Sequence, residues 1–149
     1  MNKFLVALKC GNKHKKSFLF YGLAFTLYYN MKRTLVIGAS EKPERYAYKA
    51  TVMLNEYKHE TYAYGLKAGN IEGNAIQTTW PTDQVFDTVT LYVGPQNQGD
   101  YQEKILALHP KRVVFNPGTE NAAFETILEN AGIEALEACT LVLLRTNQY

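Results

Sequence analysis

From residue 34 onward the chain alternates short apolar or β-branched runs with amphipathic stretches, and this alternation limits the folds available to it. The runs typical of strands are 34–37, 60–64, 75–78, 88–93, 112–115 and 133–138. The stretches typical of helices are 44–58, Asp100 up to Pro110, Thr119 up to Gly132, and 140–145. Such an alternation, with short loops, predicts a parallel sheet covered by helices on both faces. We expect an α/β fold: one doubly wound parallel sheet in three layers.

Several residues predict how these elements begin and pack. Helical spacing predicts a buried face in each of two helices, made of Tyr46, Ala50, Met53, Leu54 and Tyr57 in the first and of Phe124, Ile127, Leu128 and Ala131 in the second. Asp100 and Thr119 are plausible N-terminal caps. Residues 65–73 are interpreted as a glycine-containing connection, and residues 80–83 as a turn and possible helix start.

The length and the cysteine count narrow the class of protein further. A chain of 149 residues is expected to form about one domain. Its two cysteines, Cys10 and Cys139, exclude a disulfide scaffold and a four-cysteine zinc site. Its three histidines are scattered along the sequence. We therefore expect no metal site.

The charge is distributed unevenly between a leader and the rest of the chain. Residues 1–30 contain five lysines and no acidic residue, whereas the other 11 basic and all 14 acidic residues follow, giving residues 31–149 a net charge of −3. A mildly acidic body lacks the basic face that duplex nucleic acid requires. Nucleic acid is therefore not an expected partner.

Residues 1–30 read as a leader rather than as part of the domain. Their apolar run, Ser17 to Tyr29, has 13 residues and is too short to span a bilayer as a helix. Met31 is followed at once by a typical start of a cytoplasmic α/β domain. We interpret Met31 as the natural initiator and residues 1–30 as translated upstream sequence; the alternative is an unprocessed leader at a membrane surface. We expect residues 31–149 to be cytoplasmic, without a membrane partner.

The strand ends indicate where a ligand would bind. In doubly wound sheets, ligands bind outside the carboxyl ends of the strands, where the strand order switches. Each of four such ends carries a residue that turns the chain sharply or lets the backbone approach a ligand. They are Gly38-Ala39-Ser40, Gly65-Leu66-Lys67, Gly94-Pro95 and Asn116-Pro117-Gly118. Four such turns on one edge favour a site there.

The first and second turns narrow the choice of ligand. A dinucleotide fingerprint needs three glycines, and the segment after Gly38 has none. An NAD site also presents an acid after the second strand, whereas this chain has Lys67, which suits a phosphorylated ribose. The phosphate loop of ATPases is absent. An anionic nucleotide resting near the start of the first helix remains, because free N–H groups there attract phosphate.

These motifs resemble those of a known family. The segments from Gly38 to Tyr46, Val93 to Pro95, Asn116 to Gly118 and Ala138 to Thr146 are similar to the small stand-alone CoA-binding domain family, a relative of the CoA-binding domain of the succinyl-CoA synthetase α subunit. The resemblance covers residues 31–149. It implies a Rossmann-like fold, a member of the NAD(P)-binding superfamily, and coenzyme A as the ligand.

The resemblance also implies roles for individual residues. Gly38, Ala39 and Ser40 would line the pyrophosphate, with Lys42 and Arg45 beside it. Lys67 would lie near the ribose phosphate or the adenine. Val93, Gly94 and Pro95 would contact the adenine or pantetheine, and Asn116, Pro117 and Gly118 the pantetheine end. The first loop has fewer glycines than that of the synthetase, which suggests a shifted phosphate.

We therefore expect a small cytoplasmic protein that binds coenzyme A or an acyl-CoA, without a catalytic residue of its own. Cys139 is the one candidate nucleophile, and its apolar neighbours favour an inert, buried thiol instead. Two alternatives remain. One is an NADP-linked oxidoreductase, because both ligands carry a phosphorylated adenosine ribose, and the other is an interaction domain with a vestigial pocket.

Overall fold

The computed structural model describes residues 31–149, so the predicted leader, 1–30, lies outside the described residues. The strands are β1 (Arg33–Ile37), β2 (Glu60–Tyr64), β3 (Gly69–Ile71), β4 (Asn74–Gln77), β5 (Thr88–Leu91), β6 (Arg112–Phe115) and β7 (Glu134–Glu137). The helices are α2 (Tyr46–Glu56), the 3-10 helix η1 (Pro95–Asn97), α3 (Gly99–Leu108), α4 (Ala122–Asn130) and α5 (Thr140–Arg145). Each strand and helix predicted from the alternating pattern is present, with shifts of a few residues at the ends.

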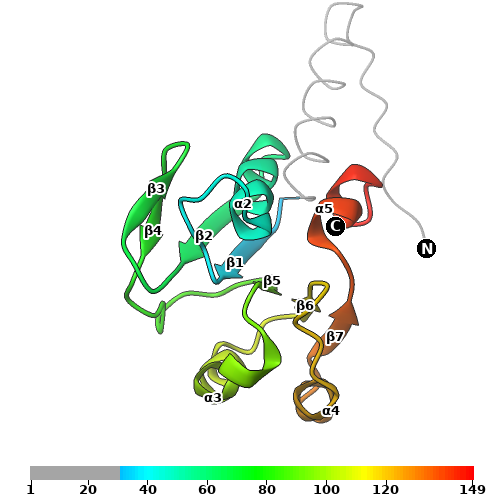
Figure 1. Cartoon of the computed structure of the whole chain (residues 1–149). Helices are drawn as coiled ribbons and strands as arrows, with labels where there is room; N and C mark the ends of the chain where they lie inside the picture. The colour runs from blue at the N-terminus through cyan, green and yellow to red at the C-terminus, as the bar shows by residue number, and fades with distance from the viewer. Residues whose placement is uncertain (1–30) are drawn as a thin grey trace, which may run out of the picture. The chain divides into compact units, whose positions relative to one another are not determined.

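The strands form one sheet in the order β3-β4-β2-β1-β5-β6-β7. Every neighbouring pair is parallel except β3 with β4. Helices α2 and α5 lie on one face of this sheet and α3 and α4 on the other (Figure 1). The α/β class and the doubly wound, three-layered, Rossmann-like architecture predicted from the sequence are therefore confirmed.

Strand β3 was not predicted, and it makes the sheet mixed rather than wholly parallel. Residues 65–73 were interpreted as a connection, but Gly69–Ile71 pairs antiparallel with β4. The two residues of the hairpin turn, Glu72 and Gly73, have φ of 46° and 90°, as a turn whose twist matches that of the flanking strands requires. A three-residue strand is too short to show an alternating pattern, and a glutamate does not signal such a turn.

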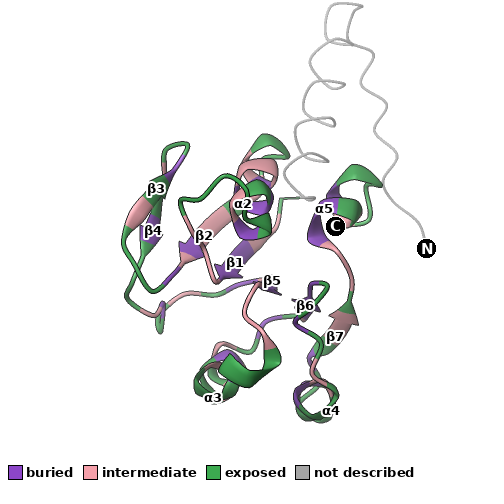
Figure 2. Cartoon of the chain, viewed as in Figure 1, coloured by how far each residue is buried: buried purple, intermediate pink, exposed green. Residues whose placement is uncertain are grey.

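Strand β1 is almost wholly buried (Figure 2), and the side chains of the central strands pack into two cores, one on each face of the sheet. Leu35, Ile37, Val89, Leu91, Val113 and Phe115 pack with Ile105 of α3 and with Phe124 and Leu128 of α4. Val36 points to the opposite face and packs with Ala47 and Leu54 of α2 and Leu144 of α5. The successive strand residues thus face both helix layers, as a central parallel strand requires.

Some details of the helices differ from the predictions. Tyr46, Tyr57 and Ile127 were predicted to be buried but have exposed fractions of 65%, 45% and 41%, because each lies at the edge of its helix's apolar stripe or at its end. Asn121, not Thr119, caps α4 by accepting a hydrogen bond from the Phe124 N–H. Gln98 precedes α3, which places Asp100 inside its first turn. Residues 80–83 form no helix.

The strand order reverses at β1. The chain moves from β1 outward to β2 on one side and later returns to place β5 on the other side. The loops after β1 and β5 therefore leave the sheet in opposite directions, which opens a crevice at their carboxyl ends.

Candidate functional site

Two hollows open at this switch point and share the turn after β1. The larger has a volume of about 840 Å³ and is lined by Gly38, Ala39, Ser40, Glu41, Lys42, Arg45, Gly65, Leu66, Lys67, Ala68, Ile76, Val93, Gln96, Asn97, Gly99, Asp100 and Tyr101. The smaller has a volume of about 570 Å³ and is lined by Gly38, Ser40, Glu44, Arg45, Tyr46, Ala47, Tyr92, Gly94, Asn116, Pro117, Gly118, Thr119, Cys139 and Leu141. Gly38, Ser40 and Arg45 belong to both hollows.

The sequence-predicted residues are brought together here, with one exception. All of those named as binding residues line one or both hollows except Pro95, which begins η1 and is exposed. Lys42, Lys67 and Val93 belong to the larger hollow only. The turn of Asn116, Pro117 and Gly118 belongs to the smaller one only. The two groups therefore face different ends of one crevice.

Gly38 shapes the shared turn. Its φ is +95°, and a Cβ at this position would lie 3.0 Å from the Tyr92 carbonyl oxygen, so a side chain here is disfavoured by both conformation and space. The N–H groups of Gly38 and Ala39 both donate to the Tyr64 carbonyl oxygen, at 3.0 and 2.9 Å. These two donors are engaged within the protein, so they line the turn without being free for an anion.

Backbone donors suited to an anion lie at the start of α2. No side chain caps the start of this helix, and the first N–H groups of a helix have no acceptor within it. The Lys42 N–H donates to Ser40 Oγ at 3.3 Å, which folds the loop back on itself. The helix dipole adds partial positive charge at the same point. An anionic group therefore fits between Ser40 and the start of α2.

Glu41 ties the same loop to the edge of the sheet. Its Oε1 accepts a hydrogen bond of 2.8 Å from the Asn70 N–H on strand β3. Gly69 makes this contact possible, because a Cβ there would overlap the Glu41 side chain, at 2.7 Å from Oε1. This hydrogen bond joins the loop after β1 to β3 across one side of the larger hollow, and we call it the Glu41 strap.

The cations around the larger hollow outnumber its free acids. Lys42, Arg45 and Lys67 are exposed on its rim. Of the two acids that line it, Glu41 is engaged by Asn70 and Asp100 lies in the first turn of α3. This rim suits a ligand with several negative charges.

The buried side-chain amide of Asn116, which lines the smaller hollow, is already paired within the protein. The Asn116 amide donates to Thr90 Oγ1 and to the Leu91 carbonyl oxygen, at 2.7 and 3.0 Å, and its Oδ1 accepts from the Thr140 N–H at 2.8 Å. Asn116 was predicted to contact the ligand, but these bonds make its side chain a brace between β5, β6 and α5. Burial raises the pKa of the Tyr92 phenol well above its ordinary value, so that wall residue is neutral.

Several lining residues were missed by sequence reasoning. Ala47 and Leu141 are buried walls of the smaller hollow. Cys139, which was expected to be a buried thiol, is half-buried and lines the same hollow. Gln96, Asn97 and Tyr101 enter the larger hollow through η1 and the start of α3. The rule that ligands meet helix starts after strand ends could have indicated this second group. The walls from α5 give no comparable signal, because that helix returns to the site from the end of the sequence.

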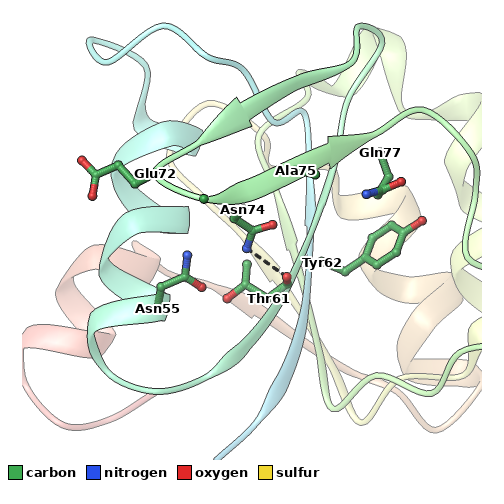
Figure 3. Close-up of a pocket in the computed structure, with 8 residues that line it drawn as sticks. Asn55, Thr61, Tyr62, Glu72, Asn74, Ala75 and Gln77 are labelled. Atoms are coloured by element: carbon green, nitrogen blue, oxygen red, sulfur yellow. Dashed lines mark hydrogen bonds between the residues drawn. The ribbon is translucent and has the colours of Figure 1, made fainter.

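A third hollow, of about 490 Å³, lies away from the switch point (Figure 3). It opens where β2 and β4 diverge, since only Ala63 with Ile76 and Tyr64 with Gln77 are paired. Asn74 Nδ2 bridges this gap by donating to the Thr61 carbonyl oxygen at 3.0 Å. No lining residue is basic, and Glu72 is its one charged member. This hollow does not suit a phosphorylated ligand.

Two further properties concern residues 31–149 alone. No group of three or more histidine, cysteine, aspartate or glutamate side chains in this region is arranged to hold a metal ion. None of the helices described is both long and apolar enough to cross a membrane.

Comparison with known proteins agrees with this architecture. An uncharacterized protein of known structure is 46% identical, with a TM-score of 0.78 over 80% of this chain and 98% of its own. A hypothetical protein from Pyrococcus horikoshii OT3 is 23% identical, with a TM-score of 0.68 over 84% of this chain and 89% of its own. The latter likeness shows the fold alone.

A much larger protein shares the same fold. The dinucleotide-forming acetyl-coenzyme A synthetase 1 of Ca. Korarchaeum cryptofilum, solved in complex with phosphate and ADP, is 17% identical with a TM-score of 0.57, over 70% of this chain and 25% of its own. No curated protein matches the chain. The model of the CoA binding domain family matches residues 32–145. The chain belongs to the CoA binding domain family.

Proposed function

We propose that this protein binds coenzyme A along the crevice at the switch point, as a binding protein without a catalytic residue of its own. The observation that carries the proposal is the meeting of two chemically different hollows at the Gly38 turn. Coenzyme A has a charged nucleotide end and an uncharged pantetheine end joined by a pyrophosphate. The larger hollow, with its cationic rim, suits the nucleotide end, and the smaller hollow suits the pantetheine end.

The pyrophosphate lies over the shared part of the crevice in this proposal. Ser40 and the uncapped start of α2 supply backbone donors, and Arg45, which lines both hollows, supplies a charge. Gly38 and Ala39 contribute the shape of the turn, because their own N–H groups bond to Tyr64. The proposal therefore puts the anion nearer to the start of α2 than to the Gly38 and Ala39 N–H groups.

In this proposal the charged and uncharged ends of the ligand occupy different hollows. The nucleotide enters the larger hollow, where Lys42 and Lys67 are available to the ribose phosphate. The pantetheine arm enters the smaller hollow beside Pro117 and Gly118. The opposite orientation would place the ribose phosphate away from both lysines, which is electrostatically unfavourable.

NADP is the competing ligand, because it also carries a phosphorylated adenosine ribose. It would extend a charged nicotinamide riboside into the smaller hollow, whose floor offers no unpaired amide from Asn116 to orient a carboxamide. The single-glycine turn also departs from the dinucleotide fingerprint. Coenzyme A is the better match on both counts.

Calorimetric titration of the full chain with CoA, NADP and NAD tests the proposal. We expect saturable binding of CoA, with NADP weaker by at least about tenfold, which corresponds to 1.4 kcal/mol. Thermal unfolding supplies an independent measurement, because a ligand that binds only the native state raises its apparent stability. Tighter binding of NADP than of CoA would favour the oxidoreductase alternative, and no binding of either would favour a vestigial pocket.

A further inference from the structure

We propose that the smaller hollow receives a short, uncharged acyl group, so that this protein binds acyl-CoA thioesters more tightly than free CoA. The inference rests on the proposed function, because it assumes that the pantetheine end enters this hollow. It goes further by assigning a chemical class to the group that the thiol carries.

The first support is the position of the hollow along the crevice. It meets the larger hollow at Gly38, Ser40 and Arg45, where the pyrophosphate is proposed to lie. Lys42 and Lys67 line only the larger hollow. A nucleotide held there leaves the smaller hollow for the far end of the ligand, where the acyl group of a thioester is attached.

The second support is that two buried polar side chains lining this hollow, Asn116 and Thr119, are already paired within the protein. Asn116 is 3% exposed, and its side-chain amide forms hydrogen bonds with Thr90, Leu91 and Thr140. Thr119 is 5% exposed, and its hydroxyl donates to the Asn116 carbonyl oxygen at 2.8 Å. These two side chains complete the protein's internal bonds, so neither offers a partner for a charged group at the end of a ligand.

The third support is the chemistry of the walls. Ala47 and Leu141, which are 4% and 7% exposed, supply aliphatic surface from α2 and α5. The Tyr92 hydroxyl is buried without a hydrogen-bond partner among the described residues, so it is an uncharged donor for the carbonyl oxygen of a thioester. The exposed ring of Tyr46 lies at the rim.

Charged side chains lie only at the mouth of this hollow. Glu44 and Arg45 are both exposed and come from the segment that leads into α2. Free CoA, which ends in a thiol, would leave much of the apolar wall in contact with water. An acyl group would cover it, and each buried methylene is worth about fourfold in affinity. A carboxylate on the acyl group would lose its hydration at the floor without gaining a paired charge.

Calorimetric titration of the full chain with CoA, butyryl-CoA and succinyl-CoA tests this proposal. We expect butyryl-CoA to bind at least about tenfold more tightly than CoA, a conservative value for three apolar carbons. We expect succinyl-CoA, which has the same four-carbon length but ends in a carboxylate, to bind no more tightly than CoA.

Substitutions in α5 and at the rim of the smaller hollow test whether the acyl group binds there. Leu141→Ala should reduce the ratio of butyryl-CoA to CoA affinity by about threefold or more, whereas Val142→Ala, its exposed neighbour on the same helix, should leave the ratio unchanged. Tyr46→Ala, at an exposed position, provides a second variant that keeps the core intact if Leu141→Ala unfolds. It should also reduce the ratio.

The outcomes separate this inference from the proposed function. Equal affinities for CoA and butyryl-CoA would overturn the acyl site while leaving CoA binding in place. An equal gain for succinyl-CoA would overturn the assignment of an uncharged group. An unchanged ratio in both Leu141→Ala and Tyr46→Ala would place the acyl group elsewhere. Binding of none of the three ligands would instead refute the proposed function itself.

Discussion

The Asn116 side chain accepts a hydrogen bond of 2.8 Å from the backbone N–H of Thr140, which joins the end of β6 to the start of α5. The same amide donates to Thr90, whose hydroxyl is 2.7 Å from that of Thr140. Three segments far apart in the sequence are thereby fixed at one point beneath the smaller hollow. The wall that α5 contributes to the site depends on this point.

Asn116→Ala should destabilise the fold. It leaves the Thr140 N–H and the Leu91 carbonyl oxygen without their partner in a buried place, and an unsatisfied buried group costs roughly 1–3 kcal/mol. We expect a loss of about 2 kcal/mol or more in the free energy of unfolding, measured by urea denaturation. Asn130→Ala, at an exposed position at the end of α4, should change it by less than about 0.5 kcal/mol. Equal effects of the two variants would show that the bridge is dispensable.

Gly69→Ala should release the strap that Glu41 forms across the larger hollow. The new Cβ would overlap the Glu41 side chain, which is free to swing outward, so the cost in stability should stay below about 1 kcal/mol. The hydrogen bond to Asn70 would be lost, and hydrogen exchange should become faster at the Asn70 N–H and in the loop that follows β1. Gly99→Ala, where a Cβ meets nothing within 4 Å, is the matched control. Unchanged exchange in Gly69→Ala would mean that the strap does not hold the loop.

The order of strands and helices could be predicted because the apolar pattern of each central element is dictated by its own burial. β1 and β5 are buried on both faces and read as continuous apolar or β-branched runs. Strand β3 was not predicted because its three residues become a strand only by pairing with β4, and a local sequence pattern cannot show such a pairing. The exposed Tyr46 illustrates the same limit, since hydrophobicity alone does not tell a core residue from one that lines a hollow.

The edge of the sheet at which the two hollows open could also be predicted, since it follows from the topology, but the internal bonds of its residues could not. Gly38 and Ala39 were expected to face the pyrophosphate; both line the larger hollow, and their N–H groups are engaged by Tyr64. That bond depends on how β1 and β2 end side by side. Asn116 likewise has the sequence context of a turn residue, and its hydrogen-bond partners on β5 and α5 come near it only in the folded protein.

Cys139 should be protected from alkylation by bound ligand, because it lines the smaller hollow. At a CoA concentration about ten times the dissociation constant, roughly a tenth of the protein remains free, so labelling by iodoacetamide should slow about tenfold. The measurement needs Cys10→Ser as the background, because Cys10 is the second thiol in the chain. Adenosine 3′,5′-bisphosphate, which lacks the pantetheine arm, is the matched control ligand and should protect less. Equal protection by both ligands would argue against a pantetheine arm in this hollow.

His59 should make the free energy of unfolding decrease as the pH falls below the ordinary pKa of histidine, about 6.5. Its Nδ1 accepts a 3.0 Å hydrogen bond from the Lys32 N–H, and its ring lies 4.9 Å from that of Tyr149. Burial, followed by the charges of Lys32 and Arg112, lowers the pKa of this imidazole in the folded protein. The folded and unfolded chains both hold a neutral ring at high pH, so no difference arises there. As the pH falls below about 6.5, the unfolded chain takes up the proton first and unfolding becomes easier.

His59→Asn tests this dependence, because its side-chain oxygen replaces Nδ1 as an acceptor but does not titrate. We expect the free energy of unfolding of the natural sequence to fall between about pH 6.5 and 5.5 by less than about 1.4 kcal/mol per pH unit, the limit for one proton. The variant should show a shallower slope over the same interval in urea denaturation. Identical slopes would mean that another group dominates this range.

Lys67 should be the residue that distinguishes CoA from dephospho-CoA. It is exposed on the rim of the larger hollow, after the end of β2, where an NAD-binding domain would present an acid to bare ribose hydroxyls. A charge-assisted hydrogen bond to a phosphate contributes about 1.5–3 kcal/mol, reduced at an exposed position by solvent screening and by the ordering of the side chain. Lys67→Ala should therefore weaken CoA binding by roughly tenfold, where 1.4 kcal/mol is one decade, and leave dephospho-CoA nearly unaffected. Calorimetric titration of both proteins, the natural sequence and the variant, with both ligands completes a double-difference cycle. The control substitution is Lys58→Ala, because Lys58 is exposed and lies beyond the end of α2. If Lys67→Ala weakens both ligands equally, the lysine does not interact with the ribose phosphate, and the nucleotide lies differently in the crevice.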